Sequence, residues 1–141
     1  MNHNKMKKAA FLLDEKFVRP GEYDREYINN LLIRLAGLGA KKVALTGIIY
    51  DNAYQGVAAY DSETGEFTEY FNENLPISCH GTGDVYSSTM FGAMILGKSL
   101  YNSIQIAVDN TVNSIRKTMG DSAHWYGVKF EEAIPDLIKM I

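Results

Sequence analysis

Apolar residues recur at helical spacing in the first part of the chain. Residues 22–38 carry apolar side chains at intervals of four, four, four and three residues: Tyr23, Tyr27, Leu31, Leu35 and Leu38. This spacing places them on one face of an amphipathic helix, and Gly39 is a suitable residue to end it. We therefore expect a helix that packs against the rest of the domain through this face.

Three more helices are predicted in the second half of the chain. From Gly83 to about Leu96 nearly every residue is small or apolar, which indicates a buried helix. Residues 100–119 repeat apolar side chains at intervals of three and four and are followed by a glycine, so they predict the clearest helix. Residues 130–140 predict a short last helix that is weakened or kinked at Pro135.

Strands are predicted in the segment between these helices. The run KKVALTGIIY is short and contains several β-branched residues, as in a strand that is covered on both faces. The runs YQGVAAYD and EFTEYF are separated by SETG, whose Gly65 suits a turn, so residues 54–71 predict a hairpin. Residues 72–82 are rich in Asn, Pro, Ser and Gly and predict a loop.

The order of these elements favours an α/β layer arrangement in one domain, residues 1–141. Two or three strands form a small sheet whose edges must be covered. We therefore expect an incomplete central sheet flanked by helices. A second copy of the chain, or a polypeptide that supplies the missing half of the sheet, is expected to complete it.

Composition and charge narrow the possible functions. The chain has 141 residues, of which 46% are hydrophobic, and a formal net charge of −3. Because Lys and Arg are scattered, a nucleic-acid partner is not expected. No apolar run reaches membrane-spanning length, and residues 1–10 lack the apolar core of a signal peptide. The single Cys79 cannot form an internal disulfide and no Cys/His cluster has metal-ligand spacing, so we expect a cytoplasmic protein without metal-ligating side chains.

The segment HGTGD, residues 80–84, stands where the predicted loop meets a predicted helix. The first N–H groups of a helix lack internal partners and carry partial positive charge. Because Gly81 and Gly83 have no Cβ, the backbone can approach an oxygen anion closely, and Thr82 adds a hydroxyl. This arrangement suits a phosphate. An ionised Asp84 beside it could accept a proton from an attacking alcohol.

The same five residues also fit a plainer interpretation. Gly-Thr-Gly before a helix can be a simple loop in which Thr82 or Asp84 caps the helix. The pattern is short, so its meaning depends on the rest of the sequence.

Four segments together resemble the C-terminal half of pyridoxal kinase, in the ribokinase-like superfamily. In chain order they are GLGAKKVALTGI, GVAAYDSETGEFTEYF, HGTGDVYSSTMFGAMILGKSLYNSIQIAVDNTVNSI and GVKFEEAIPDL. The resemblance runs from about Ala9 to Leu137 and covers only part of the family's length. It implies the C-terminal part of a three-layer α/β fold. It also implies phosphorylation of the hydroxymethyl group of a B6 vitamer, with ATP as a substrate and Mg²⁺ as cofactor.

The resemblance further implies roles for individual residues. Asp84 matches the catalytic base, which removes the proton from the vitamin's hydroxymethyl group. The anion hole that faces the γ-phosphate is matched by three residues: Gly81, Thr82 and Gly83. The related hydroxymethylpyrimidine kinases share HGTG but usually carry Cys in place of Asp84, so this residue favours pyridoxal kinase.

The nucleotide is expected to contact two further regions, again by resemblance. Thr46 and Gly47 match the strand end that reaches the nucleotide phosphates, although a β-branched residue in a strand needs no function. The adenine pocket is expected near the loop 72–78 and the helix that contains Asn110 and Asn113.

Two departures from the family bear on activity. In the family, an Asn and a Glu help to hold Mg²⁺ and ATP, and their register falls on KMKK, residues 5–8, which offers neither. The family's N-terminal half, with most of the vitamin pocket, is not matched. We therefore expect impaired activity or, as an alternative, a non-catalytic fragment that folds by self-association.

The segment GAMILGKS, residues 92–99, matches the P-loop pattern GxxxxGKS. A P-loop follows a strand and wraps phosphates with exposed backbone, whereas AMIL is expected inside an apolar helix. Gly97 is expected to end that helix and Ser99 to cap the next one. A P-loop nucleotide hydrolase that uses Lys98 is therefore the weaker alternative.

Overall fold

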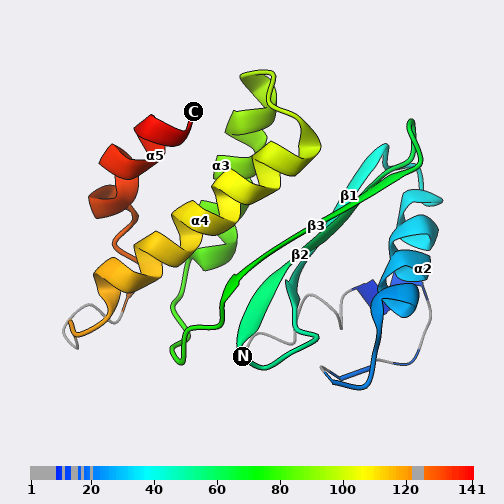
Figure 1. Ribbon diagram of the computed structural model, residues 1–141, viewed down its shortest axis with the longest axis horizontal. Coiled ribbons are helices and arrows are strands. Elements are labelled where there is room, and N and C mark those ends of the chain that lie inside the picture. Colours follow the sequence, from blue (N-terminus) through cyan, green and yellow to red (C-terminus); the bar gives the residue numbers. More distant parts are fainter. Residues whose placement is uncertain (1–8, 11, 14–15, 17, 20, 122–125) are drawn as a thin grey trace. The chain divides into compact units, whose positions relative to one another are not determined.

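The computed structural model describes residues 9–10, 12–13, 16, 18–19, 21–121 and 126–141. The chain forms two compact units, residues 1–74 and residues 75–141. The described residues of the first unit include a long helix and a three-stranded sheet, and those of the second unit form helices (Figure 1). The mixed α/β character expected from the sequence is confirmed.

The sheet of the first unit is antiparallel, with the strand order β1–β2–β3. Its strands are β1 (Lys42–Ile48), β2 (Tyr54–Asp61) and β3 (Glu66–Glu73). β2 and β3 form the predicted hairpin, and Gly65 takes a φ of 76° in its turn, a conformation that favours glycine. β3 continues two residues beyond the predicted end of the hairpin.

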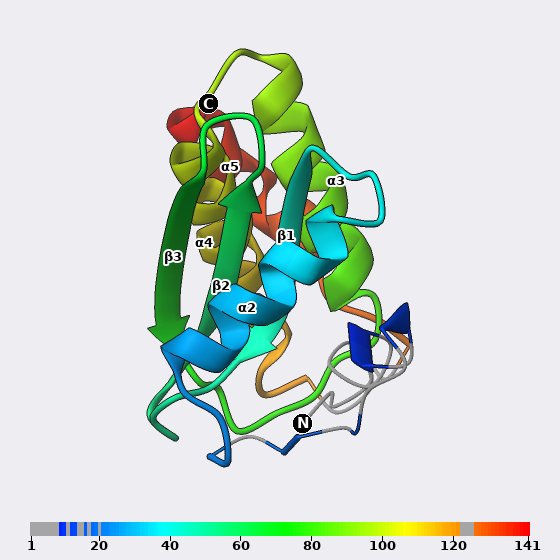
Figure 2. The same ribbon diagram turned by 90° about the vertical axis from the view of Figure 1, so that its right-hand side faces the viewer.

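Helix α2 (Arg25–Ala36) lies across one face of this sheet (Figure 2). Its first turn is capped by Asp24, whose carboxylate accepts a hydrogen bond from the backbone N–H of Tyr27 at 2.9 Å. Leu31 and Leu35 are buried as the spacing predicted, but Leu38 is 62% exposed. That part of the prediction is wrong because the helix ends at Ala36, so Leu38 lies in the turn that follows.

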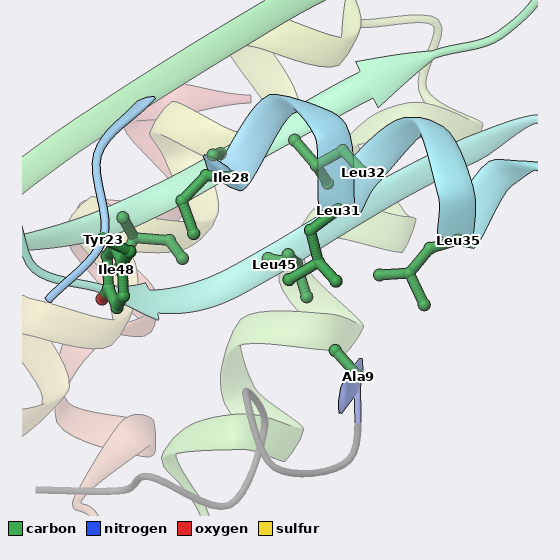
Figure 3. Packing of buried hydrophobic residues seen from close by; sticks show 9 residues of the cluster. Ala9, Tyr23, Ile28, Leu31, Leu32, Leu35, Leu45 and Ile48 are labelled. Atoms are coloured by element: carbon green, nitrogen blue, oxygen red, sulfur yellow. The ribbon is translucent and has the colours of Figure 1, made fainter. Parts of the chain in front are cut away.

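The core of the first unit lies between α2 and the sheet. Figure 3 shows Leu31 and Leu32 projecting from α2, and Leu45 and Ile48 from β1. The buried members of this cluster are Ala9, Tyr23, Ile28, Leu31, Leu32, Leu35, Leu45, Ile48 and Ala58. Since burying one Leu or Ile side chain contributes about 1.5–3 kcal/mol, this cluster is the main source of stability in the unit.

The described residues of the second unit form four helical elements. They are α3 (Thr82–Ile95), α4 (Leu100–Thr118), the short 3₁₀ helix η1 (Phe130–Ala133) and α5 (Ile134–Met140). α3 and α4 lie side by side, and α5 lies against α4 (Figure 1). Pro135 stands in the first turn of α5, where its missing N–H costs no helical hydrogen bond, so the predicted break falls between η1 and α5.

The prediction that the helix at residues 83–96 is buried is wrong. Within α3 only Tyr86 and Ala93 are buried, whereas Phe91 and Ile95 are 66% and 69% exposed. A helix that is small or apolar on every side carries no polar face to mark its exposed side. Its sequence pattern therefore cannot tell which sides other elements cover.

Candidate functional site

The turn before α3 is set by Gly81. This residue is the N-cap of α3 and has left-handed backbone angles, φ 82° and ψ −5°. The backbone N–H groups of Asp84 and Val85 both donate to the carbonyl oxygen of Gly81, at 3.1 and 3.0 Å. The N–H groups of Thr82 and Gly83 come earlier in this first turn, where a helix offers no internal acceptor. No side chain caps this helix start.

The space next to this turn is open. A Cβ added to Gly81 would meet no heavy atom within 4 Å, but a side chain at this positive φ would strain the backbone. The glycine is therefore required by the backbone conformation and not by crowding. A turn of this kind can present its free N–H groups to an anion, which a helix N-terminus favours.

The segment before the turn is held by contacts inside the second unit. The backbone N–H of Val128 donates to the carbonyl oxygen of His80 at 3.2 Å, and the hydroxyl of Thr82 donates to the carbonyl oxygen of Cys79 at 3.4 Å. These two bonds fix the entry of the chain into α3. Cys79 itself is half-buried, and burial raises the pKa of its thiol, which disfavours the nucleophilic thiolate.

Asp84 lies in the first turn of α3, and its side chain is exposed, as a group that meets a substrate must be. Within the part of the chain that the structure describes, no side chain or backbone group binds its carboxylate. The Ser88 hydroxyl donates to the backbone carbonyl of Asp84 at 2.7 Å, and the Ser87 hydroxyl donates to that of Gly83 at 2.7 Å. Both serine hydroxyls therefore donate to the helix backbone and not to the Asp84 carboxylate.

Thr46 and Gly47 lie in the first unit, at an irregularity in β1. Thr46 pairs with Val57 and Ile48 with Gly56, so the register shifts at Gly47, whose φ is 81°. A bulge of this kind re-aims neighbouring side chains and is frequent next to active sites. The hydroxyl oxygen of Thr46 is buried and has no hydrogen-bond partner among the described residues.

An unpaired buried hydroxyl needs a physical reason, because it loses its hydrogen bonds to water. A ligand oxygen beside the bulge is one such reason. Thr46 and Gly47 were expected at a phosphate site by resemblance, but the bulge itself was not predicted. A glycine inside a strand-like run was the signal that could have indicated it.

The two asparagines that were expected near the adenine pocket take part in helix packing. The side-chain amide of Asn110 donates to the Thr89 hydroxyl at 3.0 Å, which joins α4 to α3. The amide of Asn113 donates to Asp136 at 3.0 Å, which joins α4 to α5. The side-chain oxygen of Asn110 is buried without a partner among the described residues, so one acceptor here is unused.

The P-loop interpretation of residues 92–99 conflicts with the observed backbone. Residues 92–95 belong to α3, and Gly97 ends this helix with a φ of 82°. The N–H groups of Gly97 and Lys98 donate to the carbonyl oxygens of Met94 and Ala93, at 3.0 and 3.1 Å. Ser99 caps α4 by accepting a bond from the N–H of Asn102 at 3.1 Å. These N–H groups are therefore already used and cannot wrap a phosphate.

The structure thus brings four of the six predicted site residues together in one turn: Gly81, Thr82, Gly83 and Asp84. The other two lie in the first unit. Residues 5–8, on which the family's metal and nucleotide contacts were expected to fall, lie outside the described residues. Within the described ranges, no group of three His, Cys, Asp or Glu side chains could hold a metal ion. The described helices also include none with the length and apolar character to cross a membrane.

Solved structures of small-molecule kinases resemble this chain. A protein from Bacteroides thetaiotaomicron named as a phosphomethylpyrimidine kinase matches with a TM-score of 0.87 and 24% identity, over 94% of this chain and 46% of its own. A second crystal form of that protein, with pyridoxal, matches with a TM-score of 0.85 and 24% identity, over 94% of this chain and 47% of its own. Pyridoxal kinase from Lactobacillus plantarum matches with a TM-score of 0.82 and 18% identity, over 96% of this chain and 48% of its own.

These likenesses show the fold. The chain has a partial pyridoxal-kinase-like fold and spans about half the length of the solved kinases that it matches. No protein-family model matches the sequence, and a comparison with curated proteins finds no match either. The relationship to these kinases therefore rests on the path of the backbone.

Proposed function

We propose that the chain carries the nucleotide and catalytic-base half of an ATP-dependent kinase for pyridoxal or a related B6 vitamer. The observation that carries this proposal is the turn at Gly81, which leaves the first amides of α3 unbonded and sets an exposed Asp84 beside them. The likeness to pyridoxal kinase, and to a kinase crystallised with pyridoxal, supports the substrate class.

In this proposal the turn holds the phosphoryl group as it is transferred. The N–H groups of Thr82 and Gly83 donate to the γ-phosphate oxygens, with Gly81 allowing their close approach. The Thr82 hydroxyl joins them by turning from the Cys79 carbonyl to a phosphate oxygen. The Asp84 carboxylate takes the proton from the hydroxymethyl oxygen of the vitamer. That oxygen bonds to the γ-phosphorus, the bond to the β–γ bridging oxygen breaks, and ADP leaves.

Thr46 and Gly47 are proposed to bind the remaining nucleotide phosphates. The Thr46 hydroxyl has no partner among the described residues and could donate to a phosphate oxygen, while the positive φ of Gly47 suits a close backbone approach. When Mg²⁺ is bound it neutralises charge on the phosphate oxygens. The described residues do not form a site for it by themselves, so we assign it no ligand in the chain.

The proposed reaction also names the partners of the chain. The small-molecule partners are ATP and the vitamer, and the proposed compartment is the cytoplasm. Since the chain spans about half of the matched kinases, full activity would need a homodimer or a polypeptide with the other half of the fold.

A kinetic experiment tests the role of Asp84. The 141-residue chain is incubated with MgATP and pyridoxal, and pyridoxal phosphate is measured. We expect Asp84→Asn to lower kcat by about 100-fold or more, because general-base catalysis contributes about that much. Glu131→Gln removes an exposed carboxylate from η1 and serves as the matched control, with no change expected. Undiminished turnover by Asp84→Asn would contradict the proposed base.

A second candidate is a non-catalytic fragment that associates with itself. The exposed apolar residues of α3 favour it, because such residues are usually covered in a working assembly. Thermal unfolding separates the two candidates. MgATP at a hundred times its Kd should raise the stability by about 2.7 kcal/mol if the chain binds it. No shift in Tm and no product would support the second candidate.

A further inference from the structure

A hollow in the second unit is separate from the turn at Gly81. It has a volume of about 230 Å³, is partly open to solvent, and lies between the turn after α3, one face of α4 and the end of α5. α3 has 14 residues and spans about 21 Å between Gly81 and this end of the helix. None of the residues proposed above to bind the nucleotide or the vitamer lines the hollow. Its lining residues are Lys98, Asn102, Gln105, Ile106, Asp109 and Met140.

One face of α4 forms most of the wall of the hollow. Its four lining residues stand at positions i, i+3, i+4 and i+7, which share a helix face: Asn102, Gln105, Ile106 and Asp109. This face extends about 10 Å along α4. Ile106 is only 7% exposed, and Met140 adds a second apolar side chain from α5. The wall therefore combines polar groups that can orient a ligand with apolar surface that can contact its carbon chain.

The hollow carries a positive and a negative charge, which come from opposite ends of this face. Lys98 stands just before α4, whereas Asp109 comes two turns after Asn102, and both side chains are half-buried. Within the described ranges, no carboxylate lies at ion-pair distance from the Lys98 ammonium. An ammonium without a counter-ion favours an anionic group, while a carboxylate accepts hydrogen bonds from an ammonium. The hollow is therefore complementary to a molecule that carries both charges.

We propose that the hollow binds a small ω-amino acid, a zwitterion whose carboxylate and ammonium are separated by a chain of methylene groups. The ligand carboxylate pairs with Lys98 and accepts a hydrogen bond from the Asn102 amide, and the ligand ammonium pairs with Asp109. The methylene chain lies over Ile106 and Met140. The volume of the hollow is smaller than the roughly 300–1,000 Å³ of pockets for drug-sized ligands, which fits a molecule of this size.

The length of the helix face predicts the length of the ligand. The carboxylate and ammonium of glycine are attached to one carbon, so this molecule reaches Lys98 or Asp109 but not both across about 10 Å of helix face. 6-Aminohexanoate is long enough to reach both. Nuclear magnetic resonance of the labelled full chain, titrated with each compound, should show amide shifts at residues 98–109 and a Kd about fivefold or more lower for 6-aminohexanoate, since it keeps a second ion pair.

Probes with a single charge test which side chain meets which end of the ligand. Lys98→Met should weaken 6-aminohexanoate and hexanoate about fivefold, whereas Asp109→Asn should weaken 6-aminohexanoate and hexylamine but not hexanoate. Lys117→Met serves as the matched control, because it removes an exposed lysine of α4 that does not line the hollow. A purely structural role of Lys98 or Asp109 would weaken every probe alike. Circular dichroism checks that each variant is folded.

Other results overturn the proposal. Absence of shifts at residues 98–109 with tens of millimolar 6-aminohexanoate would mean that the hollow holds only solvent. Equal affinity for glycine and 6-aminohexanoate would remove the second ion pair, and unchanged binding by Lys98→Met would remove the first. The readout is binding at the hollow and not kinase activity, so it stands or falls independently of the proposed reaction.

Discussion

Helices α3 and α4 are neighbours in the chain, yet they differ in almost every physical respect. α4 buries a broad face that includes Ile104, Ala107 and Val108, and the buried hydroxyls of Ser114 and Thr118 bond to its own backbone. α3 buries two residues and leaves Phe91 and Ile95 exposed. α4 therefore forms the packed centre of the second unit, while α3 keeps exposed residues that can contact a ligand or another polypeptide.

The starts of the two helices differ in the same way. The Ser99 side chain caps α4 by accepting from a backbone N–H at 3.1 Å, which satisfies one of the free amides. α3 starts at Gly81 without a side-chain cap. A capped start is complete by itself, whereas an uncapped start retains donors for a ligand. The proposed site and the P-loop match therefore differ in their backbone N–H groups. Those at the start of α3 are free to bind a ligand, whereas those of residues 97–98 and Asn102 already have acceptors.

The largest expected difference between the helices is in core stability. Ile104→Ala should lower the free energy of unfolding by about 2–5 kcal/mol, because this side chain is fully buried. Ile95→Ala should change it by less than about 0.5 kcal/mol, because Ile95 is 69% exposed. Urea unfolding of dilute protein, where association does not contribute, gives both values. Equal losses of free energy of unfolding for the two variants would mean that other parts of the chain bury Ile95.

Two glycines of α3 should respond in opposite directions to alanine. Gly81→Ala should destabilise by about 1–2 kcal/mol, since a left-handed backbone strains any side chain. It should also weaken MgATP binding by misplacing the first amides. Gly92→Ala should instead stabilise by about 0.5–1 kcal/mol, because its Cβ would meet nothing and alanine favours a helix. Thermal unfolding and calorimetry measure these effects, and a stable Gly81→Ala with normal affinity would contradict the account.

The smallest expected effect concerns the link between α4 and α5. Hydrogen bonds from Asn113 and from Lys139 lower the pKa of Asp136 below its ordinary 3.8. Because the folded pKa is the lower one, the stabilisation is present above pH 3.8 and is lost as the pH falls through the folded pKa. Asp136→Asn should therefore make stability less sensitive to acid. Thermal unfolding in a series of acidic buffers checks this, and an unchanged acid dependence would count against the link.

The sequence predicted well the elements that have a strong local pattern, whether a helical period or a turn glycine. α4 and the hairpin follow from periodicity and from Gly65, and their bounds agree within a few residues. Gly97 and Ser99 were predicted in their roles because glycine tolerates a left-handed turn and serine accepts from a free N–H. In these cases local chemistry alone decides the structure.

The features that the sequence failed to predict depend on contacts between distant residues. The exposure of Phe91 is one, since an apolar side chain in an apolar helix gives no hint of its surroundings. The bulge at Gly47 is another, because it exists only in the pairing of β1 with β2. The proposed site could be predicted only in part from local chemistry. Its glycine turn was predicted from local chemistry, while the roles of Thr46 and Asp84 rest on resemblance.

Nuclear magnetic resonance of the labelled chain during titration with MgATP tests whether the start of α3 binds phosphate. We expect the largest amide shifts at Thr82 and Gly83, next to Gly81, and at the β1 bulge of Thr46 and Gly47. Shifts centred on residues 92–99 would contradict this expectation in favour of the P-loop. Absence of shifts at the α3 start under saturating MgATP would remove the phosphate site altogether.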